Sequence, residues 1–171
     1  EIGSLQGIPQ SGNLAMCMGV FAIYARDTIK MDTQTLIDDW VNIHMNAMNG
    51  NGFWGDRKTS HLQFQNGYHQ YEIFDYLSIC NHKKESAAYL VKKIADIRGQ
   101  YAPYFGGSGC YDYDAVAILT MPGLELNNKD KSLLIVTGNT ILSEQNSDGG
   151  FSESQWIWPT TLKTFYYGAR H

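Results

Sequence analysis

The chain has 171 residues, of which 43% are hydrophobic and 18% are charged, and its formal net charge is −4. A chain of this length and composition can bury a core, so a single domain over residues 1–171 is expected. The acidic balance and the absence of a long basic run argue against a nucleic-acid partner. The most apolar segment, residues 14–25, is too short to span a bilayer, so no membrane span is expected.

The three cysteines, Cys17, Cys80 and Cys110, do not form a CxxC pair. An odd number of cysteines without framework spacing argues against a disulfide-stapled secreted domain. We therefore expect a reducing, cytoplasmic location.

Uniformly apolar and amphipathic segments alternate along the chain. Residues 14–25 are apolar or aromatic on several faces, and a helix that is apolar nearly all round is expected to be buried on all sides. Residues 34–49 carry one apolar stripe, and Asp32 or Thr33 can cap the start of that helix. The alternation continues with two more segments of the buried type, residues 66–80 and 110–121, and two more amphipathic segments, residues 85–101 and 130–145.

Three glycine-rich loops with aromatic residues separate these segments. They are residues 49–55, 104–109 and 145–151, and their marker residues Phe53, Phe105 and Phe151 are 52 and 46 residues apart. That period suits one helix pair per repeat. Buried inner helices that alternate with amphipathic outer helices predict an all-α fold, an α/α toroid of two concentric rings.

A mixed α+β fold is the alternative. Residues 111–114 alternate between tyrosine and aspartate as a strand would, and residues 164–167 are rich in β-prone side chains. Helices are preferred because the repeat accounts for both the loops and the segments between them.

The third loop carries a family resemblance. Residues 145–151 (QNSDGGF) resemble the Gln-x-x-x-Gly-x-aromatic repeat of terpene cyclases and the Gln-x-x-Asp-Gly-Gly-Phe loop of protein prenyltransferase β-subunits. Residues 51–55, followed by residues 67–71, are similar in layout to the prenyltransferase loop and its inner helix. The resemblance implies an α/α toroid that acts on or binds an isoprenoid. Those toroids hold more helix pairs than this chain, so a partial toroid or a segment of a longer chain is expected.

Residues 110–117 (CYDYDAVA) resemble the Asp-x-Asp-Asp-Thr-Ala motif of class II terpene cyclases. Asp112 matches the first aspartate, and Asp114 matches the middle one, which is the proton donor in that family. Ala115 stands where the third aspartate would be, which weakens the acid-strengthening network. The alternative is that Asp112 and Asp114 cap the start of a helix.

An alkene-protonating acid must be held in its neutral form by burial, and the carbocation it creates needs a dry cavity with electron-rich faces. The expected substrate-binding side chains are therefore aromatic: Trp54, Tyr68, Tyr71, Phe74, Tyr111 and Tyr113.

Cys110, Asp112 and His69 are the residue types of the prenyltransferase zinc site. Their order in this chain is reversed relative to that family, so a structural Cys110 and a hydrogen-bonded His69 are preferred. No cofactor is expected.

His69 and Glu72 lie three residues apart on one predicted helix face, where they can form a general acid–base pair. Such a pair also fits a second class, a carbohydrate-active or carbohydrate-binding toroid. A third class is a non-catalytic helical-repeat module that binds a partner protein. A cyclase or transferase and these two alternatives all stay open at this point. The site is expected where the inner helices start, and the residues at its mouth are His69, Glu72, Cys110, Asp112 and Asp114.

Overall fold

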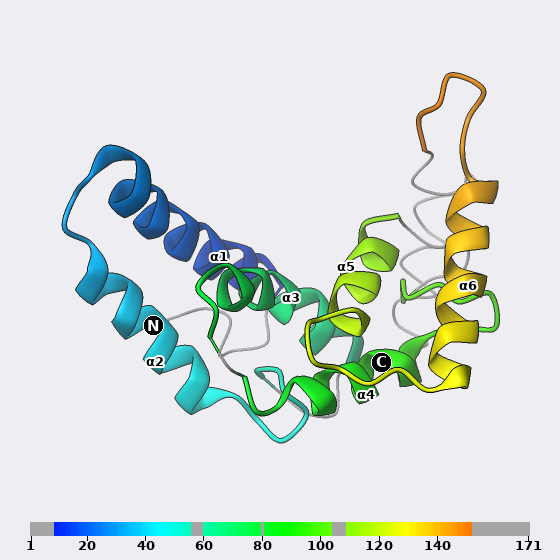
Figure 1. The fold of residues 1–171 in the computed structure, drawn as a ribbon, viewed down its shortest axis with the longest axis horizontal. Coiled ribbons are helices and arrows are strands. Elements are labelled where there is room, and N and C mark those ends of the chain that lie inside the picture. The colour runs from blue at the N-terminus through cyan, green and yellow to red at the C-terminus, as the bar shows by residue number, and fades with distance from the viewer. Residues whose placement is uncertain (1–8, 56–59, 80, 104–108, 152–171) are drawn as a thin grey trace. The chain divides into compact units, whose positions relative to one another are not determined.

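The computed structural model describes residues 9–55, 60–79, 81–103 and 109–151. Within these ranges the chain forms six α-helices and one π-helical segment, and it forms no strand (Figure 1). The all-α class is therefore confirmed for this part of the chain, and residues 111–114 are helical, so the alternative of a strand there is wrong. Residues 164–167 lie outside the described ranges.

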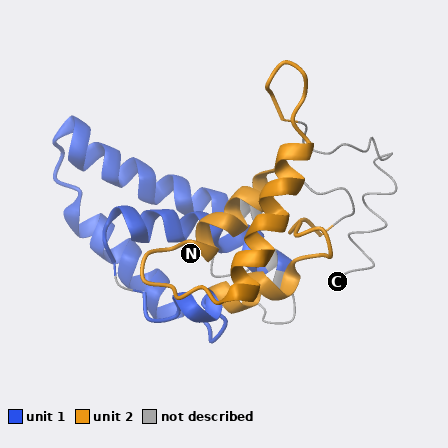
Figure 2. Cartoon of the chain, turned by 45° about the vertical axis from the view of Figure 1, so that its right-hand side comes forward, with its two compact units in different colours: residues 1–87 blue, residues 88–171 orange. Residues whose placement is uncertain are grey.

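The chain divides within one helix into two compact units, residues 1–87 and residues 88–171 (Figure 2). Each unit is described by itself. The single domain expected from the sequence stays a prediction. No helix in the described ranges is long and apolar enough to cross a bilayer.

Unit 1 is organised around the contact of α1 with α3. Its elements are α1 (Pro9–Tyr24), the π-helical η2 (Ala25–Ile29), α2 (Gln34–Ala47), α3 (Ser60–Tyr76) and the first turn of α4 (Lys84–Ile94). α1 packs mainly against α3 and also against α2. Gly19 permits this approach, because a Cβ there would lie 2.7 Å from the Ile73 side chain and 3.2 Å from the Trp40 ring.

A cluster of aromatic rings fills the core of unit 1. Its members come from α2, α3 and the turn between them, and they are Trp40, His44, Phe53, Trp54, Phe64, Tyr71 and Phe74. Buried tryptophans usually need a partner for the indole N–H. Trp40 Nε1 donates to the Ala15 carbonyl at 2.9 Å, and Trp54 Nε1 donates to the His44 carbonyl at 2.8 Å. These bonds fix α1 and the turn after α2 to the same core.

Unit 2 holds the rest of α4, α5 (Gly109–Leu119) and α6 (Asn128–Ser143). A capping box starts α6, because the Asn127 side chain accepts from the Asp130 N–H at 3.0 Å while the Asp130 side chain accepts from the Asn127 N–H at 3.2 Å. Lys92 Nζ on α4 lies 3.0 Å from an Asp130 carboxylate oxygen, which ties α4 to α6.

Three turns share one backbone hydrogen-bond pattern, and they follow α2, α4 and α6. The sequence analysis expected these three helices in the outer ring, and we call them the outer-type helices. In each turn the first residue, which we call the anchor, donates its N–H to the carbonyl four residues later. The glycine three residues after the anchor donates back to the anchor carbonyl and has a positive φ, between 69° and 86°. The anchors are Asn49, Asp96 and Asn146, and their glycines are Gly52, Gly99 and Gly149.

The second of these turns corrects the sequence analysis. Residues 96–100 were expected to belong to the amphipathic helical segment 85–101, but α4 ends at Ile94 and Ile97 is fully exposed. The Asp96 side chain accepts from the N–H groups of Arg98 and Gln100, at 2.8 and 2.9 Å, and this holds the chain out of the helix. The loop expected at residues 104–109 lies, apart from Gly109, outside the described residues.

The expected burial of α1 on every face is also wrong. Leu14 and Phe21 are among the most exposed large apolar side chains of unit 1. Within the described residues, α2 and α3 cover only one side of this helix.

Two of the turn glycines pack against the outer-type helix that follows. A Cβ at Gly52 would lie 2.7 Å from the Lys83 carbonyl oxygen and 2.9 Å from the backbone nitrogen of Ala87 in α4. A Cβ at Gly99 would lie 2.7 Å from Thr137 Oγ1 and 3.0 Å from its backbone nitrogen in α6. A Cβ at Gly149 would meet no described atom within 4 Å.

We expect Gly99→Ala to lower the free energy of unfolding by about 2–4 kcal/mol, because it combines a left-handed backbone with a clash against α6. Gly149→Ala is the matched control, since its φ is +86° but the space around it is open. It should cost only the backbone strain, about 1–2 kcal/mol. Urea denaturation followed by circular dichroism measures both changes, and equal losses would show that the contact with α6 contributes nothing.

Candidate functional site

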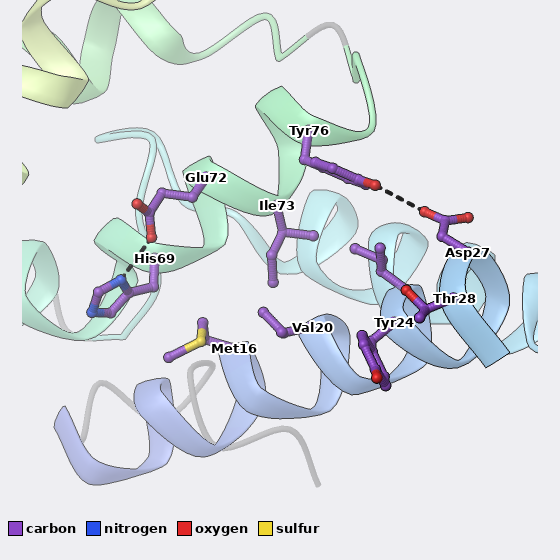
Figure 3. A pocket seen from close by; sticks show the side chains of 10 residues that line it. Met16, Val20, Tyr24, Asp27, Thr28, His69, Glu72, Ile73 and Tyr76 are labelled. Atoms are coloured by element: carbon purple, nitrogen blue, oxygen red, sulfur yellow. Dashed lines mark hydrogen bonds and ion pairs between the residues drawn. The ribbon is translucent and has the colours of Figure 1, made fainter.

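An open pocket of about 360 Å³ lies between α1, η2 and α3 in unit 1 (Figure 3). Most of its walls are apolar. Val20 on α1 and Ile73 on α3 point into the space between the two helices (Figure 3). The full lining is Met16, Val20, Ile23, Tyr24, Asp27, Thr28, His69, Glu72, Ile73 and Tyr76.

One edge of the pocket carries a hydrogen-bonded group from α3. His69 Nδ1 lies 2.9 Å from Glu72 Oε2, and the Tyr68 hydroxyl donates to Glu72 Oε1 at 2.9 Å. The helical spacing of three and four residues puts all three side chains on one face. His69 and Glu72 are partly exposed, whereas Tyr68 is buried, so the carboxylate is held from the protein side and open to the pocket.

A second polar group closes the other edge. The Tyr76 hydroxyl donates to Asp27 Oδ2 at 2.9 Å, and Arg26 Nε donates to Asp27 Oδ1 at 2.6 Å. The hydrogen bond from Arg26, followed by that from Tyr76, lowers the pKa of Asp27 to about 2. Asp27 is therefore charged at neutral pH, and it joins η2 to the end of α3.

The structure separates the aromatic residues that the sequence analysis grouped as substrate-binding. Tyr68 lies behind Glu72 at the pocket edge. Trp54, Tyr71 and Phe74 are buried in the aromatic core of unit 1, and none of them lines the pocket. The Tyr71 hydroxyl donates to the Gly52 carbonyl, so Tyr71 holds the first turn in place.

The remaining predicted site residues lie together on α5 in unit 2. Tyr111 is buried, Tyr113 and Cys110 are exposed, and Asp114 is partly buried. Asp112 is fully buried in the first turn of the helix. The first aspartate of the motif, Asp112, is therefore more deeply buried than the proposed donor, Asp114.

Asp112 connects α5 to the turn before it. Its Oδ1 accepts from the Tyr101 N–H at 2.9 Å, and its buried Oδ2 has no hydrogen-bond partner among the described residues. Burial raises the pKa of Asp112 to about 6, while the hydrogen bond from Tyr101 opposes that shift. The sequence alternative, in which Asp112 caps its own helix, is replaced by a bond to the preceding segment.

The expected gathering of the site residues at the helix starts stays a prediction, and the structure gives only the position of each residue in its own helix. α3 begins at Ser60, six residues before its predicted start, so His69 and Glu72 lie beyond its middle. Cys110, Asp112 and Asp114 do lie at the start of α5. The two sets belong to different units, so the zinc set of Cys110, Asp112 and His69 stays a prediction. Within the described residues, no three His, Cys, Asp or Glu side chains are grouped so that they could hold a metal ion.

Sequence reasoning missed the α1 and η2 side of the pocket. Met16, Val20 and Tyr24 were assigned to a helix buried on all sides, so no open wall was expected there. The contact between Asp27 and Tyr76 joins residues 49 positions apart. No periodicity signals such a pair, and the π-helical turn that presents Asp27 has no sequence signature in this chain.

His44 is the buried titratable group in the core of unit 1. Its ring stacks on Trp40 with centroids 3.8 Å apart, and Nδ1 lies 2.8 Å from the Trp40 carbonyl. Burial lowers the pKa of His44 to about 4, while the bond to Trp40 opposes that shift.

His44 and Asp112 should give the two units opposite responses to acid. The folded pKa of His44 is about 4 against 6.5 when unperturbed, so the unfolded chain binds the extra proton and unit 1 loses stability as the pH falls from 6.5 to 4. The folded pKa of Asp112 is about 6 against 3.8, so unit 2 gains stability over nearly the same range. Each effect is at most about 3 kcal/mol.

Hydrogen exchange followed by mass spectrometry separates the two responses, because peptides from α2 and α5 report on different units. Between pH 6.5 and 4, protection corrected for the intrinsic exchange rate should fall in α2 and rise in α5. Asp112→Asn keeps the acceptor for Tyr101 and should remove the rise in α5 alone. A change of the same sign in both helices would contradict the assignment.

Comparisons with protein-family models, with curated proteins and with solved structures found no match for this chain. The candidate functional site is therefore the apolar pocket in unit 1, with a hydrogen-bonded His69–Glu72 pair at one edge and a charged Asp27 at the other.

Proposed function

We propose that this chain binds a neutral isoprenoid, or an apolar chain of the same kind, in the pocket between α1 and α3. The observation that carries the proposal is the apolar wall formed by Met16, Val20, Ile23 and Ile73, with polar groups confined to the edges. A pocket of about 360 Å³ is within the range of small-molecule sites, which are mostly apolar with a few placed polar groups.

The charges at the edges favour a neutral ligand over a diphosphate. Two carboxylates, Asp27 and Glu72, border the pocket. The nearby cations are engaged, since Arg26 is paired with Asp27, Lys30 donates to the Asp27 carbonyl at 2.6 Å, and His69 is bonded to Glu72. A diphosphate would therefore meet two carboxylates in the pocket lining and no lysine or arginine there, whereas a hydroxyl could accept from or donate to the His69–Glu72 pair.

The same reasoning disfavours the carbohydrate alternative. A sugar needs many polar partners, and the walls of this pocket offer few. Binding without turnover remains consistent with the pocket, so the non-catalytic class differs from the enzyme class only in what happens to the bound chain.

We also propose that the helices form an α/α repeat of the toroid type. Support comes from the three turns, whose anchors at positions 49, 96 and 146 are 47 and 50 residues apart. Two of these turns pack their glycine on the next outer-type helix in the same way. One helix pair per turn is the period expected for such a repeat.

Binding can be measured by isothermal titration calorimetry with farnesol, a neutral isoprenoid alcohol, and with farnesyl diphosphate as the charged comparison. Val20→Asp places a carboxylate in the apolar wall and should weaken farnesol binding at least tenfold, or about 1.4 kcal/mol. Val136→Asp on α6 is the matched control, because Val20 is 44% exposed and Val136 is 40% exposed, but only Val20 lines the pocket.

The control should bind farnesol as the unmodified chain does, and circular dichroism should show both variants folded. Equal weakening by the two substitutions, or tighter binding of the diphosphate than of farnesol, would contradict a neutral ligand in this pocket.

The donor role of Asp114 stays a prediction from the resemblance. If the chain cyclises an isoprenoid after protonation, Asp114→Asn should abolish product formation, as measured by gas chromatography and mass spectrometry, while circular dichroism shows the variant folded. Asp112→Asn serves as the comparison, since Asp112 holds the Tyr101 N–H and Asp114 is only partly buried. Full turnover by the Asp114 variant would exclude it as the donor.

A further inference from the structure

The packing of α4 against α6 defines how one outer-type helix receives the next. α4 uses two features on the same side: Lys92, four residues before the anchor Asp96, and Gly99 in the turn that follows. On α6 the receiving residues are Asp130, which pairs with Lys92, and Thr137, which packs on Gly99. Asp130 and Thr137 are seven residues apart and so lie on one helix face.

α6 repeats the presenting features, but nothing described packs on them. Four residues before the anchor Asn146 lies Leu142, at the position that Lys92 holds on α4. Leu142 and Ile135 are each 64% exposed, and a Cβ at Gly138, on the same face, would meet no described atom within 4 Å.

The turn after α6 is equally open. Gly149 has the left-handed φ of the other two turn glycines, yet open space surrounds it among the described residues. Phe151, directly after this turn, is 53% exposed, whereas Tyr101 at the same place in the second turn is buried. We call the surface formed by Ile135, Gly138, Leu142, Gly149 and Phe151 the α6 edge.

We propose that the α6 edge binds a helix of the α6 kind, one that carries a large apolar residue and, seven residues later, a small residue such as alanine or threonine. The small residue would face Gly149, as Thr137 faces Gly99. The apolar residue would face Leu142, in place of the Asp130 that faces the charged Lys92. The helix that binds the α6 edge therefore differs from α6 at one position, where an apolar residue replaces the acidic Asp130.

The first outer-type helix of a second copy does not meet this requirement. Nine residues before its anchor, where α4 has Ala87 and α6 has Thr137, α2 carries Trp40. Trp40 is buried beneath α1, since its indole donates to Ala15 and Gly19 packs on its ring. Head-to-tail stacking of copies through α2 would require α1 to leave, so a separate helix is the occupant.

The probe is a fluorescent, hydrocarbon-stapled peptide of residues 127–144 with Asp130→Leu, whose helicity is first verified by circular dichroism. It should bind the full chain with micromolar affinity in fluorescence anisotropy. A peptide with the further change Thr137→Leu should bind at least tenfold more weakly, because leucine cannot approach the turn glycine. The unmodified peptide, with Asp130, should also bind more weakly because an aspartate would face Leu142.

The surface is assigned with two variants of the chain. Leu142→Glu should weaken binding of the Asp130→Leu peptide at least tenfold, and Ile97→Glu, which changes a fully exposed isoleucine elsewhere in unit 2, should not. Sedimentation equilibrium of the chain alone completes the test. The proposal would be overturned if the Asp130→Leu peptide and the peptide that also carries Thr137→Leu bound equally well, or if the Asp130→Leu peptide bound Leu142→Glu as well as it binds the unmodified chain. It would also be overturned if the Asp130→Leu peptide, once shown to be helical, did not bind, or if the chain associated with itself and Leu142→Glu abolished that association. None of these outcomes bears on the pocket in unit 1.

Discussion

The close approach between a turn backbone and a neighbouring helix is the constraint on which the helical arrangement depends. At Gly52 and Gly99 the chain turns with a left-handed residue, and the neighbouring helix lies where a Cβ would be. Glycine meets both demands at once, because it adopts positive φ without strain and leaves room for backbone contact. An asparagine or aspartate at the anchor then closes the turn, as Asp96 does by accepting two backbone N–H groups. This contact between the turn glycine and the neighbouring helix sets the distance between that helix and the helix before the turn.

Much of the helical pattern could be predicted because periodicity is a local property. α2 was expected at residues 34–49 and ends at Ala47, and α6 was expected from residue 130 and begins at Asn128. The sequence analysis missed the second turn because Asp96-Ile97-Arg98-Gly99-Gln100 contains a single glycine and no aromatic residue, whereas each of the other loops has several glycines or a double glycine next to an aromatic residue. Its isoleucine continues the apolar stripe of α4, so periodicity extended the helix. The hydrogen bonds of the Asp96 side chain end the helix, and hydrophobic periodicity does not predict them.

The candidate site shows a similar division between local and distant information. The pairing of His69 with Glu72 could be predicted, since residues three apart on a helix face one another. The opposite wall could not, because it depends on the packing of α1 on α3 and on a π-helical turn that aims Asp27 at Tyr76. The resemblance of residues 110–117 to a catalytic motif identified a buried acid, and the structure gives that acid a structural partner. Asp112 accepts a hydrogen bond from the Tyr101 N–H, and the Gln63 side-chain amide donates one to the Trp54 carbonyl at 3.4 Å. Each of these side chains fastens a turn to the helix that follows it.

This use of polar residues explains why their burial is tolerated in both units. A buried carboxylate or amide costs free energy unless it is bonded, and here the bond goes to backbone groups that a turn leaves without a helical partner. The amide of Gln63 does this without charge. Asp112 does it with a group whose pKa is raised by burial, so unit 2 loses stability as the carboxyl ionises, although the hydrogen bond from Tyr101 favours the charged form. His44, stacked in the aromatic core of unit 1, is neutral in the pH range where Asp112 changes charge, until the pH approaches 4. The same arrangement of turn and helix is therefore found in both units, and their buried titratable residues, His44 in unit 1 and Asp112 in unit 2, respond to protons in opposite ways.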